Sequence, residues 1–471
     1  MPTSLELLAR FVAETRSEQI PALVRSDIVH RVMDTLGICL AACSLETSIA
    51  ARNMSVLSGG AAEATVIGFG DRLPVATAAF VNGVLAHSLD FDDTHLPSVL
   101  HPSACVVPAA LAVAEACNST GEELVTAAAL GYEVCIRTGM AGYDNARRDS
   151  VFFENGWHAT SICGTLASAA VAARLMRLSA AQVGHAIAIA ASFGSGILEG
   201  NRSGGTVKRL HCGWAVHAGI NAAAAAKAGF TGPLTVFEGR FGFFRAFCGG
   251  PVNLGAIDHE LGCEWQAPSV FFKPYPTNHF THGIVDAALV LRTEVAEADV
   301  KEVEIALPSA TLKTVAEPPE AKAHPQSGYH AKFSAPYVFA AAMIGGADLG
   351  VGLDDFSDEN VRDPRRLALA AKARCIADQD LDAIYPDQFP ARVTVLTHSG
   401  RKVSRAILFN RGGPSNPLTH VELTQKFLSN ATRVLSREQA MELVGSIDSL
   451  PKIGPTEILA LTTERARTAA S

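Results

Sequence analysis

The sequence lacks paired cysteines. Its ten cysteines stand singly along the chain, and no two have the CxxC spacing. A zinc ribbon or a dithiol redox motif therefore has no support. Most of these cysteines lie in apolar stretches that are rich in alanine, where a reduced cysteine behaves as a small core residue. We expect a soluble cytoplasmic protein.

Long apolar runs are also missing. Glu6 and Arg10 interrupt the first twenty residues, so neither a secretory signal nor an anchor is readable there. Charge-free stretches such as 95–114 and 155–173 contain His, Pro, Ser, Thr or Gly. A bilayer span needs about 20 predominantly apolar residues, so we expect no contact with a membrane.

An excess of positive charge is absent too. The chain has 39 Lys and Arg against 47 Asp and Glu, a formal net charge of −8. Such a chain is a poor ligand for a phosphate backbone, so we expect no nucleic-acid partner. With 48% hydrophobic and 18% charged residues, the chain can bury a large core, which excludes a mainly disordered protein. Its 471 residues favour two domains.

Nucleotide and hydrolase motifs are not found. The sequence contains neither GxSxG nor GxxxxGK[ST], and the glycine-rich turn at 194–196 has no preceding strand. The first 260 or so residues instead indicate alanine-rich helices that pack closely. Expected helices are 103–117, 123–138, 158–176, 180–192 and 211–227, and four capping boxes are predicted at Thr120/Glu123, Ser179/Gln182, Thr419/Glu422 and Ser436/Gln439.

The pattern changes near residue 265. Residues 301–307 alternate apolar and charged side chains, as a half-exposed strand does, and residues 392–397 and 402–408 flank a turn and predict a hairpin. Helices are expected at 279–294 and 333–344. The fold class is therefore mainly α, with a large all-helical domain built from both chain ends (1–265 and 415–471) and an inserted smaller α+β lid domain (266–414).

One segment, residues 87–103, concentrates ionisable side chains within apolar sequence. If its first part is helical, Asp90 and Thr94 share a face, and the prolines that follow bring His101 round in a loop. Burying such a cluster is costly unless the groups are paired or used in chemistry. The alternative for Asp92 or Asp93 individually is a capping role in a solvated loop.

Two further segments place histidines and a lysine at helix starts. His158 precedes an alanine-rich helix, where the helix dipole disfavours a cation, so a neutral imidazole able to accept a proton is expected. A core histidine satisfied by a backbone group is the alternative. Lys208 and His211 lie three residues apart on one predicted helical face and suit a substrate carboxylate.

A fourth segment holds Lys273 between an aromatic residue and two prolines, near the proposed domain border. Tyr337 precedes a helix of the inserted domain, and the alternative for it is a core aromatic residue. Metal binding through Asp92, Asp93 and His95 is conceivable, but the spacing is not diagnostic.

Two other classes of protein are compatible with parts of the pattern. The aspartates at 90–93 and at 354–358 resemble the paired motifs of Mg²⁺-dependent helical isoprenoid synthases, although the second set lies in a charged, surface-like run. A non-catalytic helical binding protein is the other possibility.

The same segments, in this order, resemble the MmgE/PrpD family over essentially the whole chain. The matching stretches are VNGVLAHSLDFDDTH with HPS (81–103), GWHATSICGTLASAA (156–170), KRLHCGW (208–214), FKPYP (272–276) and FSAPY (333–337). The family includes 2-methylcitrate dehydratases, cis-aconitate decarboxylases and iminodisuccinate epimerase.

The resemblance implies a homodimer, an active site between helical domain and lid, no organic cofactor and, as a rule, no metal. Its implied substrate is a small polycarboxylic acid. Carried over by motif, the catalytic residues are His101, His158, Asp90 and Tyr337. The substrate-binding residues implied in the same way are Thr94, Lys208, His211 and Lys273.

The reaction outcome is left open among three. This chain has HPSAC where the dehydratase branch reads HPSDN, and it has Gly-Trp-His-Ala at 156–159 where decarboxylases read FHPP. A common chemical core is a proton moved at a carbon next to a carboxylate, with cations holding the substrate. We assign carboxylate binding to Lys208 and Lys273, proton transfer to His101 and His158, an orienting role to Asp90, and an alternative acid to Tyr337.

Overall fold

The computed structural model describes residues 2–200, 205–250, 252–346 and 349–463. The chain divides into two compact units, Met1–Val270 with Phe427–Ser471, and Phe271–Lys426. The predicted borders were 265/266 and 414/415, so residues 415–426 lie in the second unit instead. Arg411 explains this, because its guanidinium bonds the Tyr275 hydroxyl at 3.1 Å, the Leu349 carbonyl at 3.0 Å, and Glu422.

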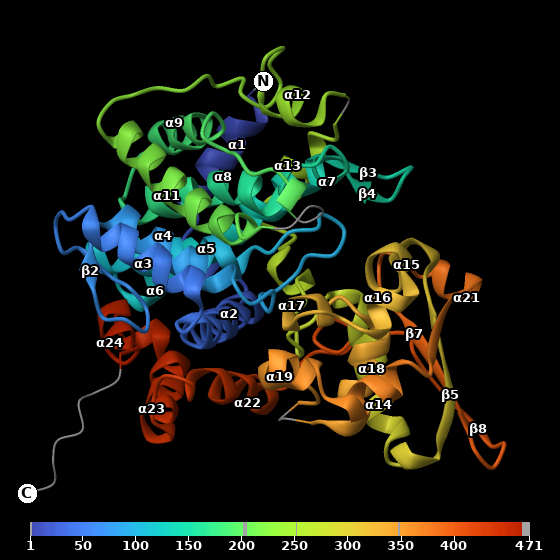
Figure 1. Ribbon diagram of the computed structural model, residues 1–471. Helices are drawn as coiled ribbons and strands as arrows, with labels where there is room; N and C mark the ends of the chain where they lie inside the picture. Colours follow the sequence, from blue (N-terminus) through green and yellow to red (C-terminus); the bar gives the residue numbers. More distant parts are fainter. Residues whose placement is uncertain (1, 201–204, 251, 347–348, 464–471) are drawn as a thin grey trace, which may run out of the picture. The chain divides into compact units, whose positions relative to one another are not determined.

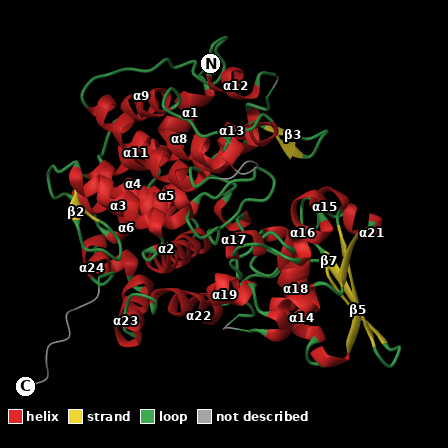
Figure 2. Ribbon diagram, viewed as in Figure 1, coloured by secondary structure: helices red, strands yellow, loops and turns green. Residues whose placement is uncertain are grey.

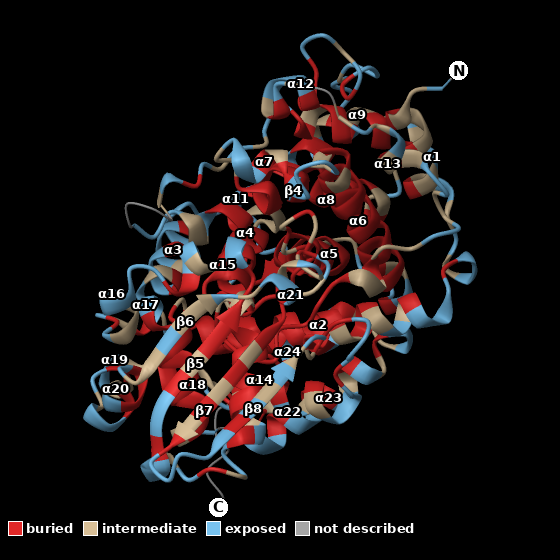
Figure 3. Ribbon diagram, turned by 90° about the vertical axis from the view of Figure 1, so that its right-hand side faces the viewer, coloured by how far each residue is buried: buried red, intermediate tan, exposed pale blue. Residues whose placement is uncertain are grey.

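The first unit is mainly helical, and its central helices are buried (Figures 1 and 3). Nearly every side chain of the central helix α5 is buried, because the helix is made almost entirely of small apolar residues. The helices of this unit are α1 (Ser4–Glu14), α2 (Ala22–Ala42), α3 (Glu46–Leu57), α4 (Val75–His87), α5 (Ser103–Ala116), α6 (Gly121–Ala141), α7 (Val151–Glu154), α8 (Ala159–Leu175), α9 (Ala180–Ala190), α11 (Lys208–Lys227), α12 (Phe243–Cys248), α13 (Gly255–Asp258), α23 (Arg437–Asp448) and α24 (Pro455–Ala460), with short 3₁₀ turns at Ser17–Gln19, Ala267–Ser269 and Leu450–Lys452.

Glycines let α11 approach its neighbours closely. A Cβ on Gly213 would lie 2.5 Å from the Phe80 carbonyl oxygen of α4, and a Cβ on Gly219 would lie 2.6 Å from the Thr165 carbonyl oxygen of α8. Both contacts are with backbone atoms, which cannot move aside alone. Small side chains therefore fix the spacing of α4, α8 and α11, the three helices that hold most of the histidines considered below.

The helical predictions for this unit are confirmed, with ends shifted by a few residues. Thr120/Glu123 and Ser179/Gln182 form complete capping boxes, and the Thr419/Glu422 pair does so at the start of α22 (His420–Ala431). Ser436 accepts the Gln439 amide at the start of α23.

The expectation of an all-helical domain was wrong in one respect. The first unit also contains two small antiparallel pairs, β1 (Ala64–Thr65) with β2 (Arg72–Leu73), and β3 (Tyr143–Asp144) with β4 (Asp149–Ser150). The first pair is held by the buried carboxylate of Glu115, which accepts the Thr65 amide at 2.7 Å and the Arg72 guanidinium at 2.6 Å. Strands of two residues show no alternation that a sequence pattern could reveal.

The second unit contains a four-stranded sheet, drawn in yellow in Figure 2, whose order is β6-β5-β7-β8 (labelled in Figure 3). The predicted strand and hairpin are confirmed as β5 (Val300–Leu307), β7 (Ala391–Thr397) and β8 (Lys402–Ile407), which pair antiparallel. The edge strand β6 (Ala373–Ala377) was not predicted and pairs parallel to β5. Helices α14 (His282–Leu291) and α18 (Ala335–Ile344) contribute to the buried core of this unit together with β5 and β7.

Smaller elements complete the second unit. They are the helices α15 (Ser309–Val315), α16 (Pro319–Ala323), α17 (Gly328–Ala331), α19 (Asp358–Val361), α20 (Pro364–Ala370) and α21 (Gln379–Asp382), with 3₁₀ turns at His279–Thr281, Glu297–Asp299 and Leu353–Phe356. Across the described part of the chain, no single helix has both the length and the apolar character to cross a bilayer, and only the bent pair α2–α3 passes by length and composition.

Candidate functional site

The segment between α4 and α5 brings the first block of polar residues together. Helix α4 ends at His87, and residues 88–102 are not helical. The expectation that Asp90 and Thr94 share a helical face was therefore wrong. Asp90 itself adopts a left-handed conformation with φ of 54°, which ends any continuation of the helix. His95 and Leu100 then pair through their backbones, which turns the chain back toward α5.

Asp93 anchors this loop to the helices. Its carboxylate accepts the amide of Ser103 at 3.0 Å and the Ser103 hydroxyl at 2.7 Å, so it caps α5. Tyr132 donates its hydroxyl to the same carboxylate at 3.0 Å, and Arg31 lies 3.4 Å away. Burial raises the pKa of Asp93 to about 6, against the opposing effects of Arg31 and Ser103. Asp93 thus has the expected capping contacts, but the solvated loop expected with them was wrong, because Asp93 is fully buried.

The ring of His101 is held through hydrogen-bond contacts of its Nδ1. Its Nδ1 lies 2.7 Å from the carbonyl oxygen of Asp93 and 3.4 Å from the Thr94 hydroxyl. Because a carbonyl oxygen only accepts, the short contact assigns the proton to Nδ1. The Nε2 of a neutral His101 is then a proton acceptor. The side chain keeps 12% of its surface exposed, unlike the histidines behind it.

A histidine–carboxylate pair lies next to His101, and it was not expected from the sequence. His87 Nδ1 is 2.7 Å from Asp92 Oδ2, and both side chains are 1% exposed. The same carboxylate oxygen is 3.8 Å from His101 Nδ1. Burial lowers the pKa of His87, but Asp92 and the nearby Cys212 outweigh burial and raise it to about 10. We therefore assign this pair as an imidazolium beside a carboxylate.

The signal for this pair was present in the sequence but ambiguous. His87 stands five residues before Asp92, a spacing that neither a continuous helix nor a strand would bring into contact. Only the break of α4 at His87 and the left-handed turn at Asp90 allow the two side chains to meet.

Two more histidines complete the cluster. His158 precedes α8 as its N-cap residue, as predicted, and its Nδ1 is 3.1 Å from the Nδ1 of His211 on α11. The ring centroid of His87 lies 5.2 Å from that of His101 and 5.2 Å from that of His158. The four imidazoles therefore form one connected group drawn from α4, the following loop, the start of α8 and α11.

The protonation of this pair follows from its surroundings. Burial, followed by the charges of His87 and Lys208, holds the pKa of His158 well below its ordinary value. Burial also lowers the pKa of His211 to about 4, with His87 and Lys208 acting in the same direction. The neutral imidazole expected at position 158 is thus supported, but its main cause is burial rather than the helix dipole.

A neutral pair that meets through two Nδ1 atoms shares a single proton between them. The ring that donates has an unprotonated Nε2, while its partner has a protonated one. Among the described residues, the Nε2 of His158 is buried and has no hydrogen-bond partner. The pair therefore offers one proton donor and one proton acceptor to a bound molecule.

Lys208 supplies a cation beside the histidines. It is the first residue of α11, on the same helical face as His211 as predicted, and its Nζ lies 3.7 Å from Asp90 Oδ1. The side chain of Lys208 is 19% exposed. The contact seen for Asp90 is thus with Lys208, whereas the carboxylate seen beside His101 belongs to Asp92. A lysine paired loosely at a helix start can exchange a partner carboxylate for that of a substrate.

Two predicted site residues belong to the second unit and are described within it. Lys273 is buried, and the neighbouring amide of Phe272 bonds the Gly412 carbonyl at 2.9 Å. Tyr337 is fully buried in the core of that unit and donates its hydroxyl to the Asp355 carbonyl at 2.8 Å. Burial raises the pKa of the Tyr337 hydroxyl. A catalytic role for either residue stays a prediction.

The carboxylates of the alternative magnesium hypothesis are engaged elsewhere. Asp355 accepts the Gly352 amide at 2.8 Å and pairs with Arg366 at 2.8 Å, and Asp358 accepts the Gly328 amide at 2.9 Å. These contacts cap turns and short helices, which is a structural use.

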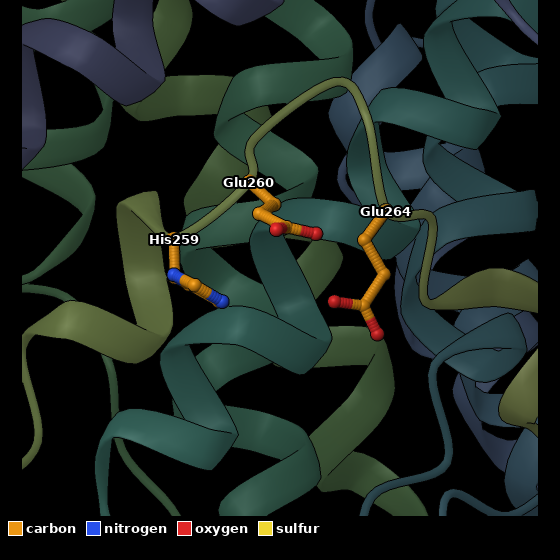
Figure 4. A group of neighbouring side chains, drawn as sticks. All are labelled: His259, Glu260 and Glu264. Atoms are coloured by element: carbon orange, nitrogen blue, oxygen red, sulfur yellow. The ribbon is translucent and has the colours of Figure 1, made fainter.

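A second cluster with metal-ligand chemistry lies on the surface. Within the described ranges, His259, Glu260 and Glu264 form the one group of three or more His, Cys, Asp or Glu side chains whose ligand atoms all lie within 4.8 Å of one another (Figure 4). All three are exposed. Acidic surface groups gather in this way without a metal, so we assign no site to them.

Comparison with known proteins covers nearly the whole chain. The family model described as the MmgE/PrpD N-terminal domain matches residues 6–254, and that described as the MmgE/PrpD C-terminal domain matches residues 275–448. The cis-aconitate decarboxylase of Homo sapiens is 30% identical over 448 residues, which cover 91% of this chain and 88% of the relative.

Other relatives are also cis-aconitate decarboxylases. The cis-aconitate decarboxylase of Mus musculus is 27% identical over 442 residues, covering 91% of this chain and 86% of the relative. That of Aspergillus terreus is 25% identical over 413 residues, covering 83% and 82%. Decarboxylases are lyases, so the similarity supports an enzyme of that class. Matches to both family domains along most of its length show that this chain belongs to the MmgE/PrpD family.

Proposed function

We propose that this protein is a carboxy-lyase that decarboxylates cis-aconitate or a closely similar tricarboxylic acid, using its own side chains without an organic cofactor. The observation that carries the proposal is the convergence of His87, His101, His158, His211 and Lys208 in one buried group. The similarity to several cis-aconitate decarboxylases supports the choice of substrate.

Substrate binding would begin at Lys208. A tricarboxylate needs cations and hydrogen-bond donors, and charge-assisted contacts of this kind are roughly twice as strong as neutral ones. Lys208 is half-buried, so a substrate carboxylate reaching it leaves water. The Thr94 hydroxyl, 3.4 Å from His101, and the neutral His211 are placed to orient the remaining oxygens.

Decarboxylation then requires a place for an electron pair and a source of a proton. The broken carbon–carbon bond leaves its pair in an allylic anion conjugated with a remaining carboxylate, and protonation of that anion at carbon completes the reaction. Lys208 would stabilise the developing negative charge, which is the larger effect in such reactions. Positioned proton transfer contributes about 10²–10⁴ in rate.

His101 is our proposed proton donor. Its Nδ1–H is committed to the Asp93 carbonyl, so any proton it delivers leaves from Nε2. Asp92, at 3.8 Å, stabilises the imidazolium that exists before transfer. His101 is also more exposed than His87 and His158, so it can regain a proton from solvent between turnovers. His158 would face the substrate with its buried Nε2 and fix one carboxylate or carbonyl oxygen.

The substrate and outcome are tested together. Purified protein is incubated with cis-aconitate, a 2-methylcitrate and an iminodisuccinate in D₂O, and the mixtures are followed by NMR with CO₂ detection. The proposal expects CO₂ and one deuterium per product molecule from cis-aconitate. Loss of water from the 2-methylcitrate, or deuterium entry without a change of skeleton in iminodisuccinate, would replace it with the dehydratase or epimerase alternative. Activity that EDTA abolishes would contradict a mechanism carried by side chains alone.

Variants locate the chemistry. Replacing His101 with Gln should lower kcat at least 10²-fold, because the proton donor is lost. The unfolding temperature should stay unchanged, because the volume of the side chain is largely kept. The matched control is His259→Gln, an exposed histidine of the same unit. Full activity in the His101 variant would reject this residue as the proton donor. The predicted roles of Lys273 and Tyr337 are tested by K273A and Y337F, and the predicted homodimer by light scattering.

A further inference from the structure

In the proposed chemistry Asp92 supports His101, but its nearer partner His87 has no task of its own, although the two form the most buried part of the cluster. Their side chains are 1% exposed and meet at 2.7 Å. Burying an ionisable pair of this kind is costly, and replacing it with apolar residues is often neutral or stabilising for a fold. Its position against both proton-transfer candidates suggests a use beyond stability.

We propose that His87 and Asp92 are positioning residues of the proposed decarboxylase site: Asp92 holds His87 as a fixed imidazolium, and this fixed cation adds to burial in keeping the imidazole of His158 neutral and ready to bind substrate oxygen. The inference deepens the proposed function, on which its catalytic part rests.

His87 and Asp92 are placed differently relative to the two neighbouring histidines. The His87 ring stands 5.2 Å from both His101 and His158, measured between ring centroids. Asp92 Oδ2 contacts His87 at 2.7 Å and His101 at 3.8 Å. The cation is therefore equally near to both rings, but at His101 the Asp92 carboxylate also lies within 3.8 Å and offsets it. The pair thus opposes a proton on His158 more than on His101.

The charged and titratable groups around His158 all come from identified elements. His87 faces it from the end of α4, His101 from the loop after α4, and Lys208 and His211 from α11. Lys208 and His87 both oppose a proton on His158, and His211 contributes in the same direction. Lys208 keeps 19% of its side chain exposed and would be partly neutralised by substrate, so His87 is the cation that remains in place throughout the cycle.

The shared proton of the His158–His211 pair explains why neutrality matters. At 3.1 Å between the two Nδ1 atoms, a single proton satisfies both rings. A second proton would place two N–H groups head to head and break the contact. By keeping His158 uncharged, His87 preserves this contact and hence the direction in which the Nε2 of His158 points.

Histidine titrations by NMR test the inference without requiring turnover. In the unaltered protein, His158 should show no titration between pH 5 and 8, and His87 should remain protonated up to about pH 9. In His87→Gln the cation is lost while Asp92 keeps its charge, so the midpoint of His158 should rise relative to the unaltered protein, with the titration followed down to the lowest pH at which both proteins stay folded. A His158 midpoint that does not rise in a folded His87→Gln protein would overturn the inference.

Asp92→Asn provides the second arm, and it applies even if the first variant does not fold. Without this carboxylate, only Cys212 is left to oppose the effect of burial on His87, so His87 should lose its proton at a lower pH than in the unaltered protein. His158 should then shift in the same direction as in His87→Gln but by less, because Cys212 still favours a proton on His87. A purely structural role of the pair predicts no difference between the two variants in the shift of the His158 midpoint. A His87 that keeps its proton to pH 9 in this variant would reject Asp92 as the group that fixes the charge. The control is His259→Gln, which should leave every other histidine unchanged.

Activity gives an additional readout if decarboxylation is observed. The acidic limb of kcat/KM should move to higher pH in His87→Gln, with a smaller change at pH 8 than at pH 6. If cis-aconitate is not consumed at all, the proposed function fails while the NMR titrations still decide the inference. Equal loss at every pH, with unchanged titrations, would reduce the pair to a structural element.

Discussion

Replacing Gly213 with Ala should damage the site without touching any of its side chains. Gly213 of α11 faces α4, and a Cβ there would lie 2.5 Å from the Phe80 carbonyl oxygen and 2.6 Å from a methyl group of Val84. Ordinary contact begins at 3.4 Å, so the two helices must separate by about 0.9 Å, the difference between 3.4 and 2.5 Å. Overpacking of this kind costs about 1–3 kcal/mol.

The same shift acts on the chemistry because the two helices hold opposing parts of the cluster. His87 ends α4, and His211 lies two residues before Gly213 on α11. A misplacement of about 1 Å can cost 10²-fold in rate. We therefore expect G213A to lower the unfolding free energy by about 1–3 kcal/mol and kcat/KM by about 10²-fold, measured by urea denaturation and by the decarboxylation assay.

Matched controls separate helix spacing from glycine chemistry. Gly184 in α9 has only an ordinary contact, at 3.5 Å, and Gly445 in α23 has no atom within 4 Å. Alanine at either site should stabilise the protein by up to about 1 kcal/mol, because alanine favours the helix. If G213A is as stable and active as G184A, the reasoning that backbone contact sets the α4–α11 distance is refuted.

Three further predictions follow from buried charges. Lys208→Ala should lower kcat/KM by about 10- to 150-fold, because it removes a charged hydrogen bond to the substrate. K227A, at the exposed end of α11, should leave kcat/KM unchanged, and equal effects of the two variants would exclude Lys208 as the carboxylate ligand. Burial lowers the pKa of His95 to about 4 in the folded state, below its ordinary 6.5. The contribution of neutral His95 to the unfolding free energy is therefore fully present above pH 6.5 and is lost as the pH falls toward 4. Urea titrations should show that about 2 kcal/mol of unfolding free energy disappears between pH 7 and 5, and His95→Asn should flatten that slope. Glu133→Ala should cost about 3–5 kcal/mol in unfolding free energy, because it removes the partner of buried Arg137 at 2.8 Å; an unchanged melting temperature would contradict this.

The histidine cluster shows how one environment produces different protonation states from identical side chains. His87 has a carboxylate at 2.7 Å and keeps a proton, whereas His158 and His211 have no such partner among their contacts and lie near cations. Burial opposes charge in these rings, so the positions of Asp92 and Cys212 beside His87 favour the proton there. This division between charged and neutral groups is what a site that moves protons requires.

Much of the first unit could be predicted from the sequence, for identifiable reasons. Alanine-rich stretches with Ser or Thr caps three residues before Glu or Gln fix helix starts locally, and the boxes at Thr120 and Ser179 form as expected. The alternation along β5 and the turn between β7 and β8 are likewise local signals. The strands β1 to β4 were missed because two-residue strands carry no alternation, and β6 was missed because its partner β5 is distant in sequence.

In the candidate site too, some features follow from local sequence signals and others depend on contacts between distant residues. His101, His158, Lys208 and His211 were identified because ionisable residues are conspicuous within apolar sequence, and this judgement needs no coordinates. By itself the sequence thus determined which side chains are available for chemistry and which helices present them. Only the tertiary structure decided that Asp92 lies 3.8 Å from His101, that Asp93 accepts the first amide of α5, and that Asp92 contacts His87 at 2.7 Å. Each of these depends on distances set by one broken helix and the close packing of its neighbours.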